Sequence, residues 1–428
     1  MSTWALAVIA CVVVAYAVLS RRLDATPVTA AIFFVSCGLV FGSKGLGWID
    51  STRSSEQVRV LAEATLTLVL FADASRIDLR ALRREYLVPV RLLGIGLPLT
   101  ILLGWAIAAG LFGGLSAGEA LLLAIILAPT DAALGQAVVT DPRLPSRIRQ
   151  GLNVESGLND GICVPLLFIA LAVADAEAQT KSAQGAATLV AEAIGYGVLF
   201  GVIAGAVGAL LLRLARSRDL ADPLWLQALP VGTAAASYGL AAPRGGSGVI
   251  AAFVAGLTFG ALRGRGEEVT QLLEELGGLS NAVTFIVFGA AIAGPVLAGM
   301  TWKVGLYGVL SLTVIRMLPV AVAFARTHAR PPTILFLGWF GPRGLASIVF
   351  TVIVLEESHL PNVSTMATVV VFTIVLSVYA HGLSARPLTD RYVAWYASHP
   401  KDRQPPMESV PAPHQRWRGP ARGAARAR

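Results

Sequence analysis

Charged residues are scarce in this sequence: Asp, Glu, Lys and Arg make up 14% of its 428 residues, while 55% are hydrophobic. Soluble globular domains carry about 25% charged residues, so this shortage argues against a soluble protein. A helix that crosses ~30 Å of hydrocarbon needs about 20 mostly apolar residues, and the chain has room for many such helices. The composition therefore predicts an all-α, polytopic membrane protein.

Cysteine is also scarce, and the three residues Cys11, Cys37 and Cys163 all lie within apolar runs. An odd number in such surroundings argues against a disulfide framework or a cysteine-bound metal, and we expect no cofactor. The net charge of +8 does not indicate nucleic acid as a partner. Its Lys and Arg residues gather in short loops and in the C-terminal tail, where membrane topology uses them, and no basic stripe with interleaved aromatics occurs.

The apolar runs predict about thirteen transmembrane helices. Gly, Ala and Ser fill many of them, which allows the close helix packing that holds a bundle together in lipid. We expect residues 1–398 to form the transmembrane domain and residues 399–428, rich in Pro, Arg, Gly and Ala, to form a disordered basic tail. The spans are predicted near residues 3–20, 27–42, 57–75, 86–112, 118–140, 152–174, 186–213, 225–242, 247–262, 280–299, 303–325, 333–355 and 363–384.

The loops predict the orientation in the inner membrane. Loops after odd-numbered spans are rich in arginine, whereas loops after even-numbered spans contain only Lys44, Arg53, Lys181, Arg244 and Lys303. Because basic loops stay in the cytoplasm, this bias places the N-terminus outside and the C-terminus in the cytoplasm. An odd number of spans agrees with that placement.

Two predicted spans are interrupted in a similar way. The fifth contains Ala128-Pro129-Thr130-Asp131, and the twelfth contains Gly341-Pro342-Arg343-Gly344. Paired broken helices in the two halves of a transporter point to its binding site. Both interruptions are therefore candidate functional segments.

Three charged side chains are predicted at one depth. Asp131 lies nine residues before the cytoplasmic end of its span, while Asp160 and Arg343 lie eight and ten residues into theirs. At 1.5 Å per residue, all three are ~12–15 Å deep, near the middle of a ~30 Å core. Charges at this depth are costly unless they face a cavity or a partner, so each is a functional candidate.

The sixth span carries a dense polar set that includes Glu155, Ser156, Asn159 and Asp160 within an arc of about 140° of one helix. Oxygen atoms of this kind can replace the water shell of a hard alkali cation. Asp160 would supply charge together with the aspartate of the fifth span. Ser156 would complete the shell.

A carbonyl near Thr130, freed by Pro129, would be a further ligand. A buried carboxylate can hold either a proton or a cation, and this competition suffices for exchange. Asn159 is either an interhelical hydrogen-bond partner or an electrostatic element. For Glu155 and Arg343 we predict a structural ion pair between two helices in preference to direct ligation.

These residues resemble those of the NhaP/NHE-type sodium/proton antiporters. The resemblance covers nearly the whole chain, and it is most specific in three motifs: Thr130-Asp131, Glu155-Ser156 followed by Asn159-Asp160, and the Gly341–Gly344 segment with Arg343. In that family the Asn-Asp pair matches Asn159-Asp160, and its aspartate carries cation or proton. The family usually has proline after the first aspartate, where this chain has Ala132, with Pro129 ahead of it instead.

The resemblance implies an NhaA/NapA-like antiporter fold with inverted repeats and two broken crossing helices. It implies a homodimer in which a six-helix core moves against a dimerisation domain, and we place spans four to six and eleven to thirteen in that core. The implied activity is not enzymatic. It is exchange of Na+, with Li+ or K+ as alternatives, for H+ by alternating access, and electroneutral because the motif is Asn-Asp.

Two other functions are weighed. A potassium-selective cation/proton efflux protein would use the same elements. An intramembrane aspartyl protease would use Asp131 and Asp160, but such enzymes carry a Gly-x-Gly-Asp motif, whereas this chain has Leu158-Asn159-Asp160-Gly161.

Overall fold

A computed structural model describes residues 3–23, 26–49, 55–77, 87–131, 133–178, 183–264, 269–357 and 360–398. Within these ranges the chain is almost entirely helical and contains no β-strand. The predicted all-α class is confirmed. The tail predicted at 399–428 lies outside the described residues.

The first half of the chain contains helices of very unequal length. Short π-helical turns, η1 here and η3 further on, interrupt two of the helical rods, and neither was predicted. The elements are α1 (Thr3–Leu23), α2 (Ala30–Phe41), α3 (Ser55–Arg76), α5 (Leu87–Arg91), η1 (Leu92–Gly96), α6 (Leu97–Leu111), α7 (Ala117–Ile126), α8 (Gln136–Val139) and α9 (Ser146–Glu177).

The second half begins and ends with a helix of 35 residues. Its elements are α10 (Ala183–Ser217), α11 (Pro223–Ala241), η2 (Ala242–Arg244), α12 (Gly248–Leu262), α13 (Gln271–Val287), η3 (Phe288–Ala293), α14 (Gly294–Val296), η4 (Leu297–Gly299), α15 (Trp302–Leu312), α16 (Val314–Ala323), α17 (Pro331–Trp339), α18 (Leu345–Glu357) and α19 (Val363–Ala397).

Seven helical stretches of the described chain are long and apolar enough to cross a membrane, and four shorter apolar helices accompany them. The protein is therefore a multi-pass membrane protein, as predicted. The exact number of thirteen spans stays a prediction.

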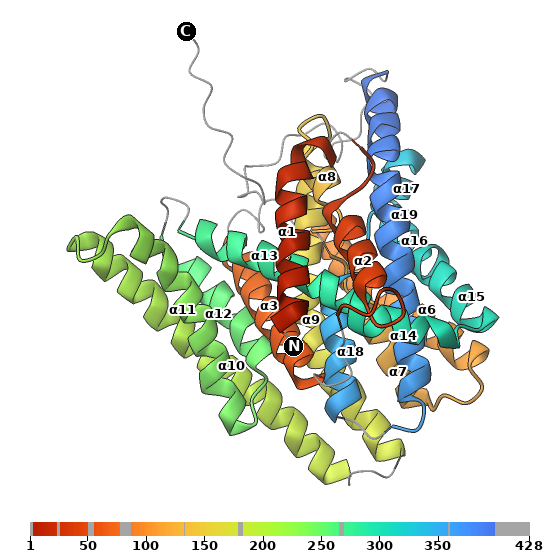
Figure 1. The fold of residues 1–428 in the computed structure, drawn as a ribbon, viewed down its shortest axis with the longest axis horizontal. Coiled ribbons are helices and arrows are strands. Elements are labelled where there is room, and N and C mark those ends of the chain that lie inside the picture. The colour runs from red at the N-terminus through yellow and green to blue at the C-terminus, as the bar shows by residue number, and fades with distance from the viewer. Residues whose placement is uncertain are drawn as a thin grey trace.

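On one side of the molecule the helices pack at glycine positions. Helix α12 lies between α3 and α10, and Figure 1 shows α10, α11 and α12 together at one end of the bundle. A methyl group added at Gly256 would lie 2.5 Å from the carbonyl oxygen of Phe71, and one at Gly260 would lie 2.4 Å from that of Ser75. The α3–α12 contact therefore brings backbone against backbone, in agreement with the expected role of small residues.

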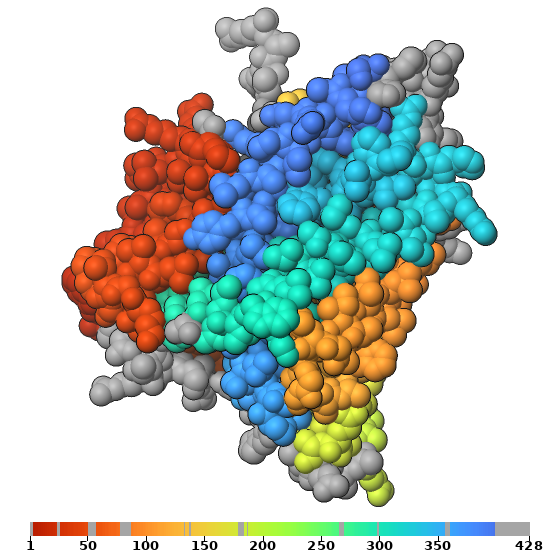
Figure 2. All heavy atoms as spheres, turned by 90° about the vertical axis from the view of Figure 1, so that its right-hand side faces the viewer, coloured from red at the N-terminus to blue at the C-terminus, as the bar shows by residue number. Residues whose placement is uncertain are grey.

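The other helices form a second group around α9. Helix α7 packs against α6 and α9, while α19 packs against α15, α17 and α18. Figure 2 shows α19 in blue between the red α1–α2 pair and the teal α15–α17 segment. Helices α9 and α18 also contact α3, so they lie at the seam between the two groups.

Helix α19 extends further than predicted. The predicted span ended at residue 384, but the helix continues through Pro387 to Ala397. The added turns pack on α17, where the hydroxyl groups of Tyr392 and Thr333 lie 2.9 Å apart and the rings of Tyr392 and Phe336 are 4.5 Å apart. These contacts between distant segments stabilise helix beyond the apolar run on which the prediction rested.

Both predicted interruptions are present. Helix α7 ends at Ile126 and α8 begins only at Gln136, while α17 ends at Trp339 and α18 begins at Leu345. Each interruption leaves backbone groups without helical partners. The side chains that satisfy those groups define the candidate site.

Candidate functional site

The two interruptions meet at Asp131. Its backbone N–H donates to the carbonyl oxygen of Pro342 at 2.8 Å. Its Oδ2 accepts from the N–H of Leu345 at 3.0 Å, and its Oδ1 accepts from the N–H of Ala133 at 2.8 Å. Asp131 thus binds the positive N-terminal end of α18, a position that favours a carboxylate. A methyl group at Gly344 would lie 2.2 Å from Oδ2, so glycine is required there.

Arg343 binds the opposite end of the other broken helix. Its side chain is completely buried, and its Nη1 donates to the carbonyl oxygens of Ala128 at 2.5 Å and Pro129 at 3.1 Å. These carbonyls follow the C-terminal end of α7, where a cation is favoured. The hydroxyl of Ser347 donates to Ile126 O at 2.7 Å. Side chains of the second interruption therefore replace hydrogen bonds that the first one lost.

The predicted ion pair between Glu155 and Arg343 is wrong. Glu155 is bound by Arg316 of α16, whose Nη1 and Nη2 donate to the two carboxylate oxygens at 2.5 and 2.8 Å. Both side chains are 3% exposed. Arg343 instead donates through Nη1 to the carbonyls after α7, while its Nε and Nη2 have no hydrogen-bond partner among the described residues. Gly341 makes room for the pair, because a methyl group there would lie 2.4 Å from Nε of Arg316.

The polar face of α9 meets the first interruption, as predicted. The hydroxyl of Ser156 donates to the carbonyl oxygen of Thr130 at 2.6 Å, and Nδ2 of Asn159 donates to the Thr130 hydroxyl at 2.7 Å. Both predicted features of this region, the freed carbonyl at Thr130 and the interhelical bond of Asn159, are therefore present. The oxygens of Thr130, Ser156 and Asn159 lie in one buried cluster.

Asp160 follows this cluster on α9. Its side chain is 7% exposed, and its Oδ1 has no hydrogen-bond partner among the described residues. The same holds for Oδ1 of Asn159. Buried polar atoms almost always have a partner, so two adjacent exceptions on one helix point to a ligand. The available atoms are all oxygens, the donor type that alkali cations prefer.

A cavity of about 280 Å³ leads to these carboxylates. Asp131 and Asp160 line it together with Asp73 of α3 and Asn281 of α13. In the structure Asp73 is 8% exposed and lines the cavity, while Nε of Arg76 donates to Glu274 at 2.6 Å.

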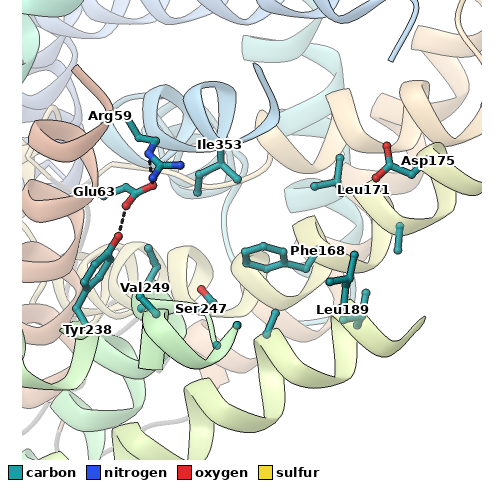
Figure 3. Close-up of a pocket in the computed structure, with 17 residues that line it drawn as sticks. Arg59, Glu63, Phe168, Leu171, Asp175, Leu189, Tyr238, Ser247, Val249 and Ile353 are labelled. Atoms are coloured by element: carbon teal, nitrogen blue, oxygen red, sulfur yellow. Dashed lines mark hydrogen bonds and ion pairs between the residues drawn. The ribbon is translucent and has the colours of Figure 1, made fainter. Parts of the chain in front are cut away.

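A second cavity, of about 460 Å³, lies along the other half of α9 (Figure 3). Arg59 and Glu63 of α3 lie on one side of it, and Asp175 of α9 lies on the other. Tyr238 of α11 donates a hydrogen bond to Glu63. Neither Asp131 nor Asp160 lines this cavity, so only the smaller one reaches the candidate site.

Comparison with known proteins gives a consistent result. The family model described as "Sodium/hydrogen exchanger, transmembrane" matches residues 8–391. A Na(+)/H(+) antiporter of Saccharomyces cerevisiae is 27% identical over 410 residues, which cover 82% of this chain and 40% of the relative. The K(+)/H(+) antiporter NhaP2 of Shewanella oneidensis is 25% identical over 359 residues, covering 82% of this chain and 61% of the relative. The chain thus spans about two fifths to three fifths of the length of these relatives.

A solved structure shares the fold. The sodium proton antiporter MjNhaP1 from Methanocaldococcus jannaschii at pH 8 superposes with a TM-score of 0.74 at 18% identity. The match covers 91% of this chain and 98% of that one. The predicted antiporter fold is thereby confirmed for the described residues.

Proposed function

Because this chain belongs to the sodium/hydrogen exchanger family, a family of transporters, we propose that it is a secondary active antiporter exchanging a monovalent cation for H+ by alternating access. The observation that carries the proposal is Asp160. It is a buried carboxylate with an oxygen that lacks a partner among the described residues, and it lines a cavity together with Asp131 of the first broken helix. Proton and cation would compete for this one group.

The other site residues have distinct proposed roles. Thr130, Ser156 and the Oδ1 of Asn159 supply neutral oxygens to the cation. Asp131 adds charge at the cavity wall while both of its oxygens also hold backbone N–H groups. Glu155 contributes charge to the site and, through Arg316, joins α9 to α16. The Asp131 contacts argue against a water-activating protease dyad, in which the carboxylates must be free to share a proton.

We propose Na+ as the first cation, with K+ and Li+ as alternatives. Relatives named for Na+ and for K+ both support exchange of alkali cations. The Asn159-Asp160 pair supports electroneutral exchange of one cation for one proton. The two cavities support alternating access, in which α9 and α18 shift against α3 and α12 along the seam. We further propose a homodimer in the inner membrane, with the N-terminus outside and the C-terminus in the cytoplasm.

Exchange is tested in everted membrane vesicles from cells that lack their own antiporters. The vesicles are acidified, Na+, K+ or Li+ is added in turn, and the pH gradient is followed with a fluorescent base. We expect the gradient to collapse with the wild type and to persist with Asp160→Asn. Asp219→Asn is the matched control, because Asp219 lies in the α10–α11 loop at φ 51°, which asparagine tolerates. No response of the wild type to any alkali cation would refute the proposal.

A second assay tests electroneutrality. The same exchange is measured in proteoliposomes with the membrane potential either set to zero or imposed by a potassium diffusion gradient. We expect equal initial rates for Na+ exchange. A rate that follows the imposed potential would show net charge movement and contradict the inference from Asn159-Asp160.

A further inference from the structure

One face of α19 packs against the second interruption, between α17 and α18. Ser377, His381 and Ser384 are spaced four and three residues apart, so they share that face. Ser377 is completely buried and His381 is 1% exposed. The sequence alone predicts no role for them, because the predicted span ended at 384 and put His381 at its edge. In the continuous helix His381 lies near the middle.

Hydrogen bonds connect this face to both ends of the interruption. Nε2 of His381 lies 2.9 Å from the carbonyl oxygen of Trp339, the last residue of α17. Nδ1 of His381 lies 3.1 Å from the hydroxyl oxygen of Ser377, which accepts from the backbone N–H of Arg343 at 2.7 Å. The chain Trp339–His381–Ser377–Arg343 therefore spans the interruption.

The hydrogen-bonding capacity of each partner indicates which ring nitrogen of His381 carries hydrogen. A backbone carbonyl only accepts, so Nε2 of His381 must carry hydrogen. The backbone N–H of Arg343 only donates, so the Ser377 hydroxyl is left to donate its own hydrogen to Nδ1. Nδ1 also lies 3.0 Å from the carbonyl oxygen of Ser377, but that carbonyl already accepts from the helical backbone N–H four residues later. The neutral ring in the Nε2–H form therefore gives both Trp339 and the Ser377 hydroxyl their partners. A hydrogen bond on one ring nitrogen thus sets the form of the other.

The last residue of α17 is held to α19 by its side chain as well. Nε1 of Trp339 donates to the hydroxyl of Ser384 at 2.9 Å, and the indole ring packs on His381 with ring centroids 5.0 Å apart. On the opposite side, Arg343 reaches the carbonyls after α7 and Leu345 donates to Asp131. The interrupted segment is therefore held between α19 and α7.

We propose that His381 is a positioning residue for cation/proton exchange. Acting with Ser377, it fixes the backbone between Trp339 and Arg343, and so keeps the Leu345 N–H on Asp131. This inference rests on the proposed function, because it assigns a role within the exchange cycle. It does not place His381 in contact with the cation.

Side-chain replacements at His381 test the proposal. The amide nitrogen of His381→Gln reaches the level of Nε2 and can donate to Trp339, whereas the shorter amide of His381→Asn cannot. We expect Gln to keep the maximal exchange rate within about threefold of wild type and Asn and Leu to lose about tenfold. Asn and Leu remove the hydrogen bond from α19 to the Trp339 carbonyl and leave that carbonyl with the Gly341 N–H, so the interrupted backbone is no longer held to α19. The cation concentration for half-maximal exchange should change less than the rate.

Two hydroxyl variants on α19 form a matched pair. Ser377→Ala removes the acceptor of the Arg343 N–H and should lower the rate as His381→Asn does. Thr373→Val one turn earlier removes a buried hydroxyl that bonds only Val369 of its own helix, at 2.7 Å, and should leave the rate unchanged. Two results would overturn the proposal. One is a wild-type exchange rate in His381→Leu, and the other is an equal loss of rate in folded His381→Gln and His381→Leu.

A measurement without transport tests the hydrogen-bond assignment directly. Nitrogen NMR of protein labelled in histidine, compared with His381→Gln, should show a neutral ring protonated at Nε2. A ring protonated at Nδ1 would overturn the proposal even if the wild type proved inactive in exchange. If the wild type shows no exchange but gives the expected NMR signal, the proposed function alone is refuted.

Discussion

At the scale of single residues, the buried arginines Arg343 and Arg316 have separate roles. Arg343 binds backbone carbonyls at the end of α7, while Arg316 binds the Glu155 carboxylate through two parallel hydrogen bonds. The sequence identified Arg343, because it follows a Gly-Pro step in an apolar span. It did not identify Arg316, although this arginine lies within the predicted span 303–325, because its partner Glu155 is 161 positions away. Pairing of such distant side chains depends on the packed fold.

Removing one member of the Glu155–Arg316 pair should destabilise the protein strongly. Arg316→Met leaves a buried carboxylate without its partner, at a cost of about 3–5 kcal/mol. Combining it with Glu155→Gln should restore much of the loss. Thermal unfolding in detergent measures both variants. Arg244→Met, at an exposed arginine, is the control, and a single Arg316 variant as stable as this control would contradict the expectation.

The loop between α8 and α9 provides a prediction on pH. The Arg143 guanidinium hydrogen-bonds Asp141 at 2.6 Å and contacts Asp390 of α19 at 2.8 Å. This hydrogen bond lowers the pKa of Asp141 below its usual range. The contact therefore stabilises the fold above the unfolded-state pKa of about 3.9 and is lost as pH falls through the lower folded-state pKa.

Asp141→Asn should accordingly lower the unfolding temperature at pH 7 relative to wild type. The difference between the two proteins should shrink as the pH falls below the unfolded-state pKa of about 3.9 and through the lower folded-state pKa of Asp141. Thermal unfolding in detergent across this pH range provides the measurement. A difference that grows on acidification would contradict the assigned direction.

At the scale of elements, the broken helices were predictable because their signals are local. Pro129 and the Gly341-Pro342 step each disturb a helix within a few residues. The hydrogen bonds by which each interruption supplies partners for backbone groups of the other were not predictable. It depends on Asp131 meeting the N-terminus of α18 and on Arg343 meeting the C-terminus of α7, which are contacts across more than 200 residues.

A methyl group at Gly344 tests this contact. Gly344→Ala places Cβ where Oδ2 of Asp131 lies, so the carboxylate must leave the Leu345 N–H. We expect a loss of exchange of about tenfold or more, consistent with a buried hydrogen bond to a charged group. Gly110→Ala in α6 is the control, because nothing lies within 4 Å of its added methyl. Equal exchange rates for the two variants would show that the contact is dispensable.

At the scale of the whole molecule, the two cavities lie along opposite halves of α9. Apolar runs and loop charges predicted the membrane class and a direction of insertion. They contain no information on which cavity reaches Asp160, because a cavity arises from the packing of helices distant in sequence. Asp73 illustrates the limit, because it belongs to none of the motifs that the sequence singles out, whereas the folded bundle places it on the cavity wall.

Chemical labelling tests the sidedness of the cavities. In a variant without native cysteines, Gln136→Cys reports on the smaller cavity and Ala242→Cys on the larger. A membrane-impermeant thiol reagent should label Gln136→Cys in everted vesicles and Ala242→Cys in intact cells. Added Na+ should slow labelling only at Gln136→Cys. Labelling of both variants from one side would contradict the proposed orientation.

The contacts of Arg343 have a consequence for selectivity. Its guanidinium and the hydroxyl of Ser347 supply the interrupted end of α7 with partners that belong to the protein itself. An arriving ion therefore does not have to organise that backbone, and its binding energy is not spent on ordering flexible chain. The backbone after α7 then stays in place, so the protein cannot accommodate a larger or smaller ion simply by rewinding the helix. Discrimination among alkali cations should thus respond more sharply to substitutions that loosen this backbone than to substitutions that change the charge of the site.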